Sequence, residues 1–96
     1  SDLVVAPGIA LPHARPSALV RRPGAAIVTL LEPVAFGHPH NDPVRVVIAL
    51  ASMTQTDHIR TLADLAVRLD RPGVVDAVAA ATARADAIDA IEGDAA

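Results

Sequence analysis

Two nearly continuous apolar runs occupy the middle of the chain. The segments 25–32 (AAIVTLLE) and 44–52 (VRVVIALAS) have the length of strands and contain few polar positions. Such runs are typical of strands covered on both faces, because neither face then has to meet water. We therefore expect both segments to be central strands of one sheet.

An earlier apolar stretch, residues 3–11 (LVVAPGIAL), is broken by Pro7 and Gly8. Proline cannot donate to a strand ladder and glycine favours turns, so the stretch predicts two short strands that meet at a turn. The segments 15–24 and 33–43 are rich in proline, glycine and short polar residues. We expect them to be connections.

The spacing of apolar positions changes after residue 57. A first helix is predicted, with apolar positions at Ile59, Leu62, Ala63, Ala66 and Leu69 and polar ones at Arg60, Thr61, Asp64 and Arg68. Its candidate N-caps are Thr54, Thr56 and Asp57.

Two shorter helices are predicted towards the end of the chain. Pro72 suits the first turn of a helix within residues 72–83, and Gly93 suits the end of another. Strands that precede helices, with strands buried on both faces, indicate a layered α/β domain rather than a sandwich.

Composition narrows the class of function. The 96 residues are 52% hydrophobic and 20% charged, which is typical of one globular domain. Phe36 is the single aromatic residue, so aromatic side chains on which bases could stack are lacking. The net charge is −3, which disfavours binding to a phosphate backbone, and we expect no nucleic-acid partner. The chain contains no cysteine, which excludes disulfides and thiolate chemistry.

The same sequence predicts where the protein acts. No apolar run approaches the ~20 residues that cross a bilayer, so we expect a soluble, cytoplasmic protein. The chain enters a strand-like run almost at once and does not begin with methionine. We therefore expect it to start inside a longer domain.

Four histidines, His13, His38, His40 and His58, fall at predicted loops or ends of elements. His13 follows a strand, and small Ala14 leaves room beside its ring. His58 begins the first helix, four and seven residues before leucines, which turns its side chain towards the sheet. We expect His13 and His58 to open onto one cleft at the same end of the sheet.

Two imidazoles, without a cysteine or a serine elbow motif, suit phosphoryl chemistry. A neutral imidazole, with a pKa near ~6.5, can attack phosphorus and carry the phosphoryl group as a phosphoramidate. His13 or His58 would be the nucleophile and the other would hold it or donate to the phosphoryl oxygens, with helical N–H groups nearby. Arg15 is a candidate phosphoryl-binding residue, and the chemistry requires no metal or cofactor.

Other interpretations stand beside this one. His38 and His40 lie in a GHPH segment that resembles a metal-binding pair only weakly, because Pro39 is expected to send the side chains apart and no third ligand has a recognisable spacing. A zinc-dependent hydrolase is thus a minor alternative. Asp57 is read as an N-cap rather than a general base.

Three stretches together resemble one protein family over nearly the whole chain. They are GIALPHARP (8–16), FGHPHNDPVRVVIALAS (36–52) and DHIRTLADLAVRL (57–69). In this order they resemble the enzyme IIA domain of the fructose/mannitol type from the bacterial sugar phosphotransferase system. The segment from Phe36 to Pro43 looks closest to the ascorbate branch of that family.

The resemblance implies a fold and a relay. The fold is a mixed β-sheet flanked by helices. His13 matches the phosphorylated histidine of the family, and His58 matches its second active-site histidine. The histidine phosphocarrier protein would phosphorylate His13, which would pass the group to a cysteine or histidine of a IIB component, while a membrane IIC component imports the sugar. Docking would use an apolar patch from Ile9, Leu11 and Ala14, with Arg15 on its rim.

The resemblance also defines the alternatives. Family members carry a further segment before the His13 motif, so residues 1–96 would be a single enzyme IIA domain lacking its N-terminal segment. An uncovered sheet edge would favour a homodimer. A regulatory module of the nitrogen type, or one attached to a transcriptional regulator, would use phosphorylation to control a partner instead of transport. A truncated, catalytically silent remnant is the third possibility.

Overall fold

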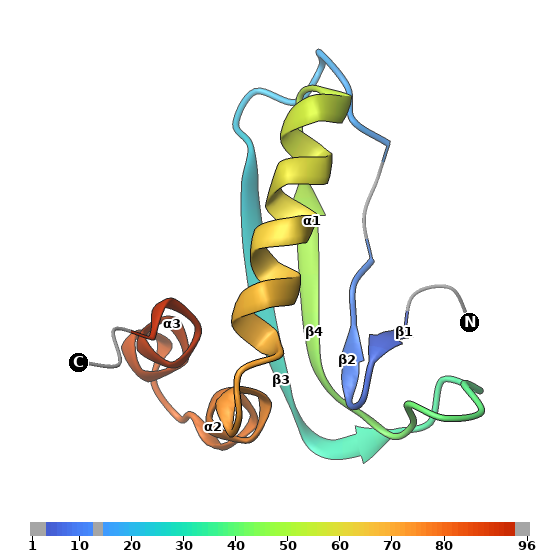
Figure 1. The fold of residues 1–96 in the computed structure, drawn as a ribbon, viewed down its shortest axis with the longest axis vertical. Helices are drawn as coiled ribbons and strands as arrows, with labels where there is room; N and C mark the ends of the chain where they lie inside the picture. Colours follow the sequence, from blue (N-terminus) through green and yellow to red (C-terminus); the bar gives the residue numbers. More distant parts are fainter. Residues whose placement is uncertain (1–3, 13–14, 94–96) are drawn as a thin grey trace.

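The computed structural model describes residues 4–12 and 15–93 (Figure 1). The elements found there are the strands β1 (Val4–Ala6), β2 (Ile9–Ala10), β3 (Gly24–Val34) and β4 (Val44–Ala51), followed by the helices α1 (Gln55–Leu69), α2 (Val74–Ala80) and α3 (Arg84–Glu92). The strands form one sheet in the order β1-β2-β4-β3. β2 and β4 are parallel and the other pairs are antiparallel, so the mixed α/β fold is confirmed.

The turn between β1 and β2 requires a glycine. Gly8 has a φ of 78°, in the left-handed region where a side chain causes strain. Its carbonyl oxygen accepts hydrogen bonds from the backbone N–H groups of Arg45 and Val46, and its own N–H donates to the Asn41 carbonyl. The prediction of two short strands meeting at Pro7 and Gly8 is therefore confirmed, and the turn anchors the start of β4.

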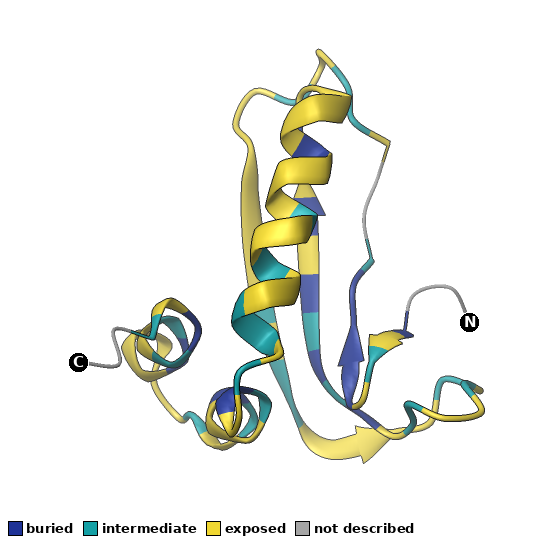
Figure 2. Cartoon of the chain, in the orientation of Figure 1, coloured by how far each residue is buried: buried dark blue, intermediate teal, exposed yellow. Residues whose placement is uncertain are grey.

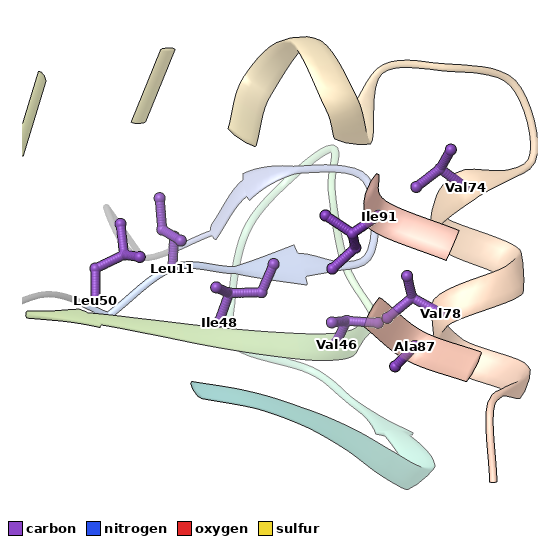
Figure 3. Packing of buried hydrophobic residues seen from close by; sticks show 8 residues of the cluster. All are labelled: Leu11, Val46, Ile48, Leu50, Val74, Val78, Ala87 and Ile91. Carbon is purple, nitrogen blue, oxygen red and sulfur yellow. The ribbon is translucent and has the colours of Figure 1, made fainter. Parts of the chain in front are cut away.

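β4 supplies the centre of the hydrophobic core. Val44, Val46, Ile48 and Leu50 alternate along the strand and are all buried. The face with Val46, Ile48 and Leu50 packs against Val78 and other residues of α2 and α3, together with leucines of α1 (Figure 3). The expectation that 44–52 forms a central strand is confirmed, because β4 lies between β2 and β3.

The expectation for residues 25–32 is wrong in one respect. The segment forms a strand, but β3 lies at the edge of the described sheet and most of its residues are exposed (Figure 2). Ile27 packs against the core, whereas Val28 and Leu31 are exposed. The physical reason is that β3 has a neighbouring strand on one side only, and few of its side chains are covered by the helices. An apolar run does not by itself tell an edge strand from a central one.

α1 begins at a capping residue that the sequence identified among three candidates. Thr54 is the N-cap, and its hydroxyl oxygen accepts the backbone N–H of Asp57. Asp57 therefore lies in the first turn and is not the cap. Ile59 faces solvent, which corrects the predicted apolar face; so do Ala63 and Ala66. The sheet-facing side contains instead His58, Leu62, Leu65 and Leu69.

The two short helices form where the sequence predicts them, and α2 is shorter at both ends than the predicted range 72–83. α2 begins at Val74, after Gly73 as N-cap, so Pro72 precedes the helix instead of lying in its first turn. α3 ends at Gly93, which has left-handed backbone geometry as predicted. Arg71 donates to the carbonyl oxygens of Ile91 and Gly93, at 2.6 and 2.8 Å, and thereby caps this helix end.

Within residues 4–12 and 15–93, no helix combines the length and the apolar character that a bilayer crossing requires.

Candidate functional site

The site is organised by the parallel pairing of β2 and β4. Ile9 pairs with Val46 and Ala10 with Val47, so the carboxyl ends of both strands lie at the same edge of the sheet. Beyond β2, the carbonyl oxygen of Pro12 accepts the backbone N–H of Leu50 at 3.2 Å. The residue that precedes His13 is therefore fixed against the end of β4, and the chain between β4 and α1 continues from that strand end (Figure 1).

His58 lies at this edge with its ring buried. Its exposure is 5%, and its Nδ1 lies 3.2 Å from the hydroxyl oxygen of Ser52, which is equally buried. The position follows from helical geometry, because His58 occupies the sheet-facing side one turn before Leu62. The prediction that His58 turns towards the sheet is confirmed.

His13 and Ala14 lie outside the described residues, so the role of His13 stays a prediction. Arg15, the next described residue, is exposed. Neither of the two ion pairs found in 4–12 and 15–93 includes it. Its guanidinium is therefore available for an anion at the surface.

The connection after Arg15 is attached to the same edge. The backbone N–H of Ser17 donates to the Ser52 carbonyl at 3.1 Å. The Ser17 hydroxyl in turn accepts the N–H of Leu19, which closes a turn that exposes the Leu19 side chain. Ser52 thus joins three parts of the site: the end of β4, the connection from Arg15, and His58 of α1.

The docking patch expected around His13 needs correction. Ile9 and Leu11 are 1% and 6% exposed, and Leu11 belongs to the main core. Because their side chains are buried in the protein interior, they cannot present an apolar surface to a partner. The exposed apolar side chains near this edge are Leu19, Met53 and Ile59.

An apolar groove lies between the β1–β2 turn and α1. Its volume is about 640 Å³, and its walls include Val5, Pro7, Leu62 and Val67. Among the described residues of its lining, Asp70 is the one ionisable side chain, and it carries the wrong charge for a phosphate. The described part of the lining therefore offers a phosphate apolar surface and one carboxylate, and no cation.

The remaining two histidines belong to a separate loop between β3 and β4. The Asp42 carboxylate accepts three backbone N–H groups, from Phe36 at 3.1 Å, Gly37 at 2.7 Å and His38 at 3.0 Å. Desolvation opposes ionisation of this carboxyl group, but the hydrogen bonds from the three backbone N–H groups prevail and lower its pKa. Asp42, near the C-terminal end of the loop, therefore ties the two ends of the loop together.

His38 closes the same loop from the other side. Its Nδ1 accepts the backbone N–H groups of His40 and Asn41, at 3.1 and 3.0 Å. The two rings lie edge to face with centroids 6.3 Å apart, so Pro39 does not send them far apart as expected. The described residues contain no group of three potential ligands that could hold a metal ion.

Sequence reasoning missed Ser52 and the structural role of Asp42. Ser52 directly follows a buried strand and precedes His58 by six residues. This spacing indicates a contact between the two side chains only once the path of the chain from β4 to α1 is known. The sequence places Asp42 in a predicted connection and in the segment that resembles the ascorbate branch, and neither predicts its hydrogen bonds. Asp42 accepts the backbone N–H of Phe36, six residues earlier, because the loop folds back on itself.

Comparison with known proteins agrees with this geometry. Residues 1–93 match the family described as phosphoenolpyruvate-dependent sugar phosphotransferase system, EIIA 2. Proteins named ascorbate-specific PTS system EIIA component are 46% identical over 55 residues in Shigella boydii serotype 4 (strain Sb227) and 44% identical in Escherichia coli (strain K12). Each match covers 57% of this chain and 36% of the relative.

Solved structures resemble the whole fold. A crystal structure described as a PTS IIA(PtxA) of Streptococcus mutans has a TM-score of 0.76 and 29% identity, and the alignment covers 93% of this chain and 56% of that one. The nitrogen regulatory protein IIA-Ntr of Neisseria meningitidis has a TM-score of 0.69 and 27% identity over 88% of this chain and 57% of that protein. The chain thus spans little more than half of these structures, and it belongs to the EIIA 2 family of the phosphoenolpyruvate-dependent sugar phosphotransferase system.

Proposed function

We propose that this chain carries a phosphoryl group on His13, between the histidine phosphocarrier protein and a IIB component. One observation carries the proposal: Pro12 is hydrogen-bonded to Leu50, two residues before the serine that contacts His58. The residue before His13 and the buried His58 are thereby fixed at one edge of the sheet. Membership of the EIIA 2 family supports the same assignment.

The proposed chemistry is an exchange of nitrogen–phosphorus bonds. An unprotonated nitrogen of His13 attacks the phosphorus of the donor's phosphohistidine; a new N–P bond forms as the donor's N–P bond breaks, and the donor nitrogen keeps the bonding electron pair. In the second step, a cysteine or histidine of the IIB component attacks the same phosphorus and the His13 nitrogen leaves. No metal or cofactor enters either step.

His58 and Arg15 have supporting roles in this proposal. His58 donates to the phosphoryl oxygens during onward transfer, from a buried position in the first turn of α1. The partial positive charge of that helix N-terminus adds to the effect. Arg15 is exposed at the start of the connection 15–24, and its guanidinium binds the phosphoryl dianion from the edge of the site.

The substrate class follows from the relatives. Proteins named ascorbate-specific EIIA components are 44–46% identical over the matched residues, so we assign the chain to import of ascorbate or a related sugar through a membrane IIC component. In this role residues 1–96 form part of one enzyme IIA domain that acts in the cytoplasm.

A regulatory role is the second candidate. The likeness to the nitrogen regulatory protein of Neisseria meningitidis favours it, at 27% identity. In that case His13 would still accept a phosphoryl group, but the product would be an altered binding surface instead of a phosphorylated IIB component. The higher identity to the ascorbate-specific relatives favours transport.

The test is phosphorylation with purified components. The chain is incubated with phosphoenolpyruvate, enzyme I and the histidine phosphocarrier protein, and its mass is measured. We expect an acid-labile gain of about 80 Da that is lost in His13→Ala and retained in His40→Ala, the matched variant in an exposed loop. No gain on the folded wild-type chain would contradict the proposal.

Adding a IIB component distinguishes the two candidate roles. Transport requires that the gained mass move from the chain to an ascorbate-system IIB component. Retention of the group, with IIB unphosphorylated, would favour regulation. Arg15→Ala should retain phosphorylation and slow it by several-fold, about the loss of one exposed charged hydrogen bond.

A further inference from the structure

A buried hydroxyl group lies beside the buried imidazole of the site. Ser52 and His58 are each 5% exposed, and the Ser52 hydroxyl oxygen is 3.2 Å from Nδ1 of His58. A buried hydroxyl and a buried ring nitrogen both require hydrogen-bond partners. The pair therefore needs an account of which atom carries the proton.

The protons can be assigned by counting partners. In the parts of the chain that the structure describes, Nδ1 of His58 is the one hydrogen-bond partner of the Ser52 hydroxyl. If Nδ1 carried the hydrogen and donated it, the hydroxyl hydrogen of Ser52 would be buried without an acceptor. The satisfied arrangement has the hydroxyl donating to an unprotonated Nδ1, which leaves the hydrogen of neutral His58 on Nε2.

We propose that Ser52 is a positioning residue that holds His58 in the Nε2–H tautomer and fixes the rotation of its ring. Its catalytic consequence rests on the proposed function: an Nε2–H group can donate to phosphoryl oxygens, whereas a lone pair at Nε2 would repel them. Ser52 itself touches no reacting atom. It acts through the imidazole alone.

The frame around Ser52 is rigid enough for this role. Ser52 follows the last residue of β4, and its carbonyl oxygen accepts the N–H of Ser17. His58 is held by α1, whose first turn is capped by Thr54. Because the hydroxyl and the ring are fixed by different elements, rotation of the ring about its own bonds would break their contact.

The test reads the tautomer directly. The ¹⁵N-labelled wild-type chain is studied by two-bond ¹H–¹⁵N correlation of its imidazoles at pH about 8, which lies above the pKa of a free imidazole. His58→Ala identifies the His58 signals. We expect Nδ1 at the frequency of an unprotonated nitrogen and Nε2 at that of a protonated one. In Ser52→Ala both frequencies move towards the mean of two tautomers, and in Ser52→Thr the wild-type pattern returns.

Thr56→Ala is the matched control, since it removes an exposed hydroxyl from the same turn of α1 and should leave the His58 signals unchanged. A protonated Nδ1 in the wild type, or unchanged His58 frequencies in Ser52→Ala, would overturn the assignment. Thermal melting shows whether each variant is folded, and the wild-type spectrum decides the tautomer even if Ser52→Ala does not fold.

The catalytic consequence has its own measurement. Phosphoryl transfer from the phosphorylated chain to a IIB component should be about tenfold slower in Ser52→Ala and nearly unchanged in Ser52→Thr. Equal rates in wild type and Ser52→Ala would overturn the positioning role. If the wild type accepts no phosphoryl group, the proposed function fails, while the imidazole spectrum still decides the tautomer.

Discussion

His58 and His38 both use Nδ1 as a hydrogen-bonding atom, but their surroundings differ. The Nδ1 of His58 lies 3.2 Å from the buried hydroxyl oxygen of Ser52, at the edge where β2 and β4 end. The Nδ1 of His38 accepts two backbone N–H groups of its own loop. The first ring is placed by tertiary structure and the second organises local structure.

This difference separates chemistry from folding. A ring whose Nδ1 accepts two N–H groups of the main chain helps to determine the conformation of that chain, so its replacement should change stability. A ring whose Nδ1 contacts a side-chain hydroxyl holds no backbone N–H group of its own loop at that nitrogen, so its replacement should change reactivity. Variants of both regions can break or sharpen the contrast.

The largest effect is expected for His58→Ala. His13 should still accept a phosphoryl group, while onward transfer to a IIB component should slow by about 100-fold, because a hydrogen-bond donor to the phosphoryl oxygens is lost. A time course of phosphate loss from the phosphorylated chain measures it, with His40→Ala as the control. Complete loss of both steps would contradict this division of roles.

Asp42→Asn should have the next largest effect, and it acts on stability. The amide keeps one acceptor oxygen and turns a donor towards backbone N–H groups, so the loop at Phe36, Gly37 and His38 loses hydrogen bonds. We expect a lower midpoint of urea unfolding at pH 7. Rates of phosphoryl transfer, measured on the folded variant, should stay near wild type.

The same carboxylate predicts an acid dependence. The pKa of Asp42 is lower in the folded chain than in the unfolded one, so the folded state binds fewer protons near that pKa. Its contribution to stability is present above the unfolded pKa, about 3.9, and is lost as the pH falls through the lower folded pKa. Between pH 5 and 2, the midpoint of urea unfolding should fall more steeply with decreasing pH for the wild type than for Asp42→Asn. Parallel curves of midpoint against pH would contradict the assignment.

His38→Ala and His40→Ala form a matched pair in one loop. The first removes the acceptor of two backbone N–H groups and should destabilise the chain by on the order of 1–2 kcal/mol. The second removes an exposed ring and should change the free energy of unfolding by less than about 0.5 kcal/mol. Chemical denaturation measures both. Equal losses would mean that the His38 contacts have no special role.

Thr54→Ala is expected to have a smaller effect than His38→Ala. Loss of the N-cap hydroxyl should destabilise α1 by about 1 kcal/mol, and Thr56→Ala, outside the cap position, should be nearly silent. Because Thr54 supports the helix and not the His58 ring, phosphoryl transfer should change by less than about twofold. A loss of transfer comparable to that of His58→Ala would show that the ring depends on the cap.

Much of the fold was predictable because local signals were strong. Pro7 and Gly8 broke an apolar stretch into two strands, and Gly93 ended a helix, as their backbone preferences require. Thr54 was among the named caps. The edge position of β3 was not predictable, since an apolar run reports what a strand prefers and not what lies beside it.

The site was predictable to a similar extent. The helical spacing of His58 to the leucines of α1 indicated a ring facing the sheet, and the structure places it there. Ser52 escaped notice because a serine after a strand is common in turns. The buried state of Ile9 and Leu11 also escaped, because a short apolar stretch does not say which side chains the core will consume.

By itself the sequence determined the elements, the EIIA resemblance and the histidines worth testing, because these follow from residue type and spacing along the chain. Tertiary structure decided that Pro12 is held against β4 and that Ser52 contacts His58. Such contacts join residues from separate segments, and the packing of a mixed sheet against helices, not local preference, brings them within hydrogen-bonding distance.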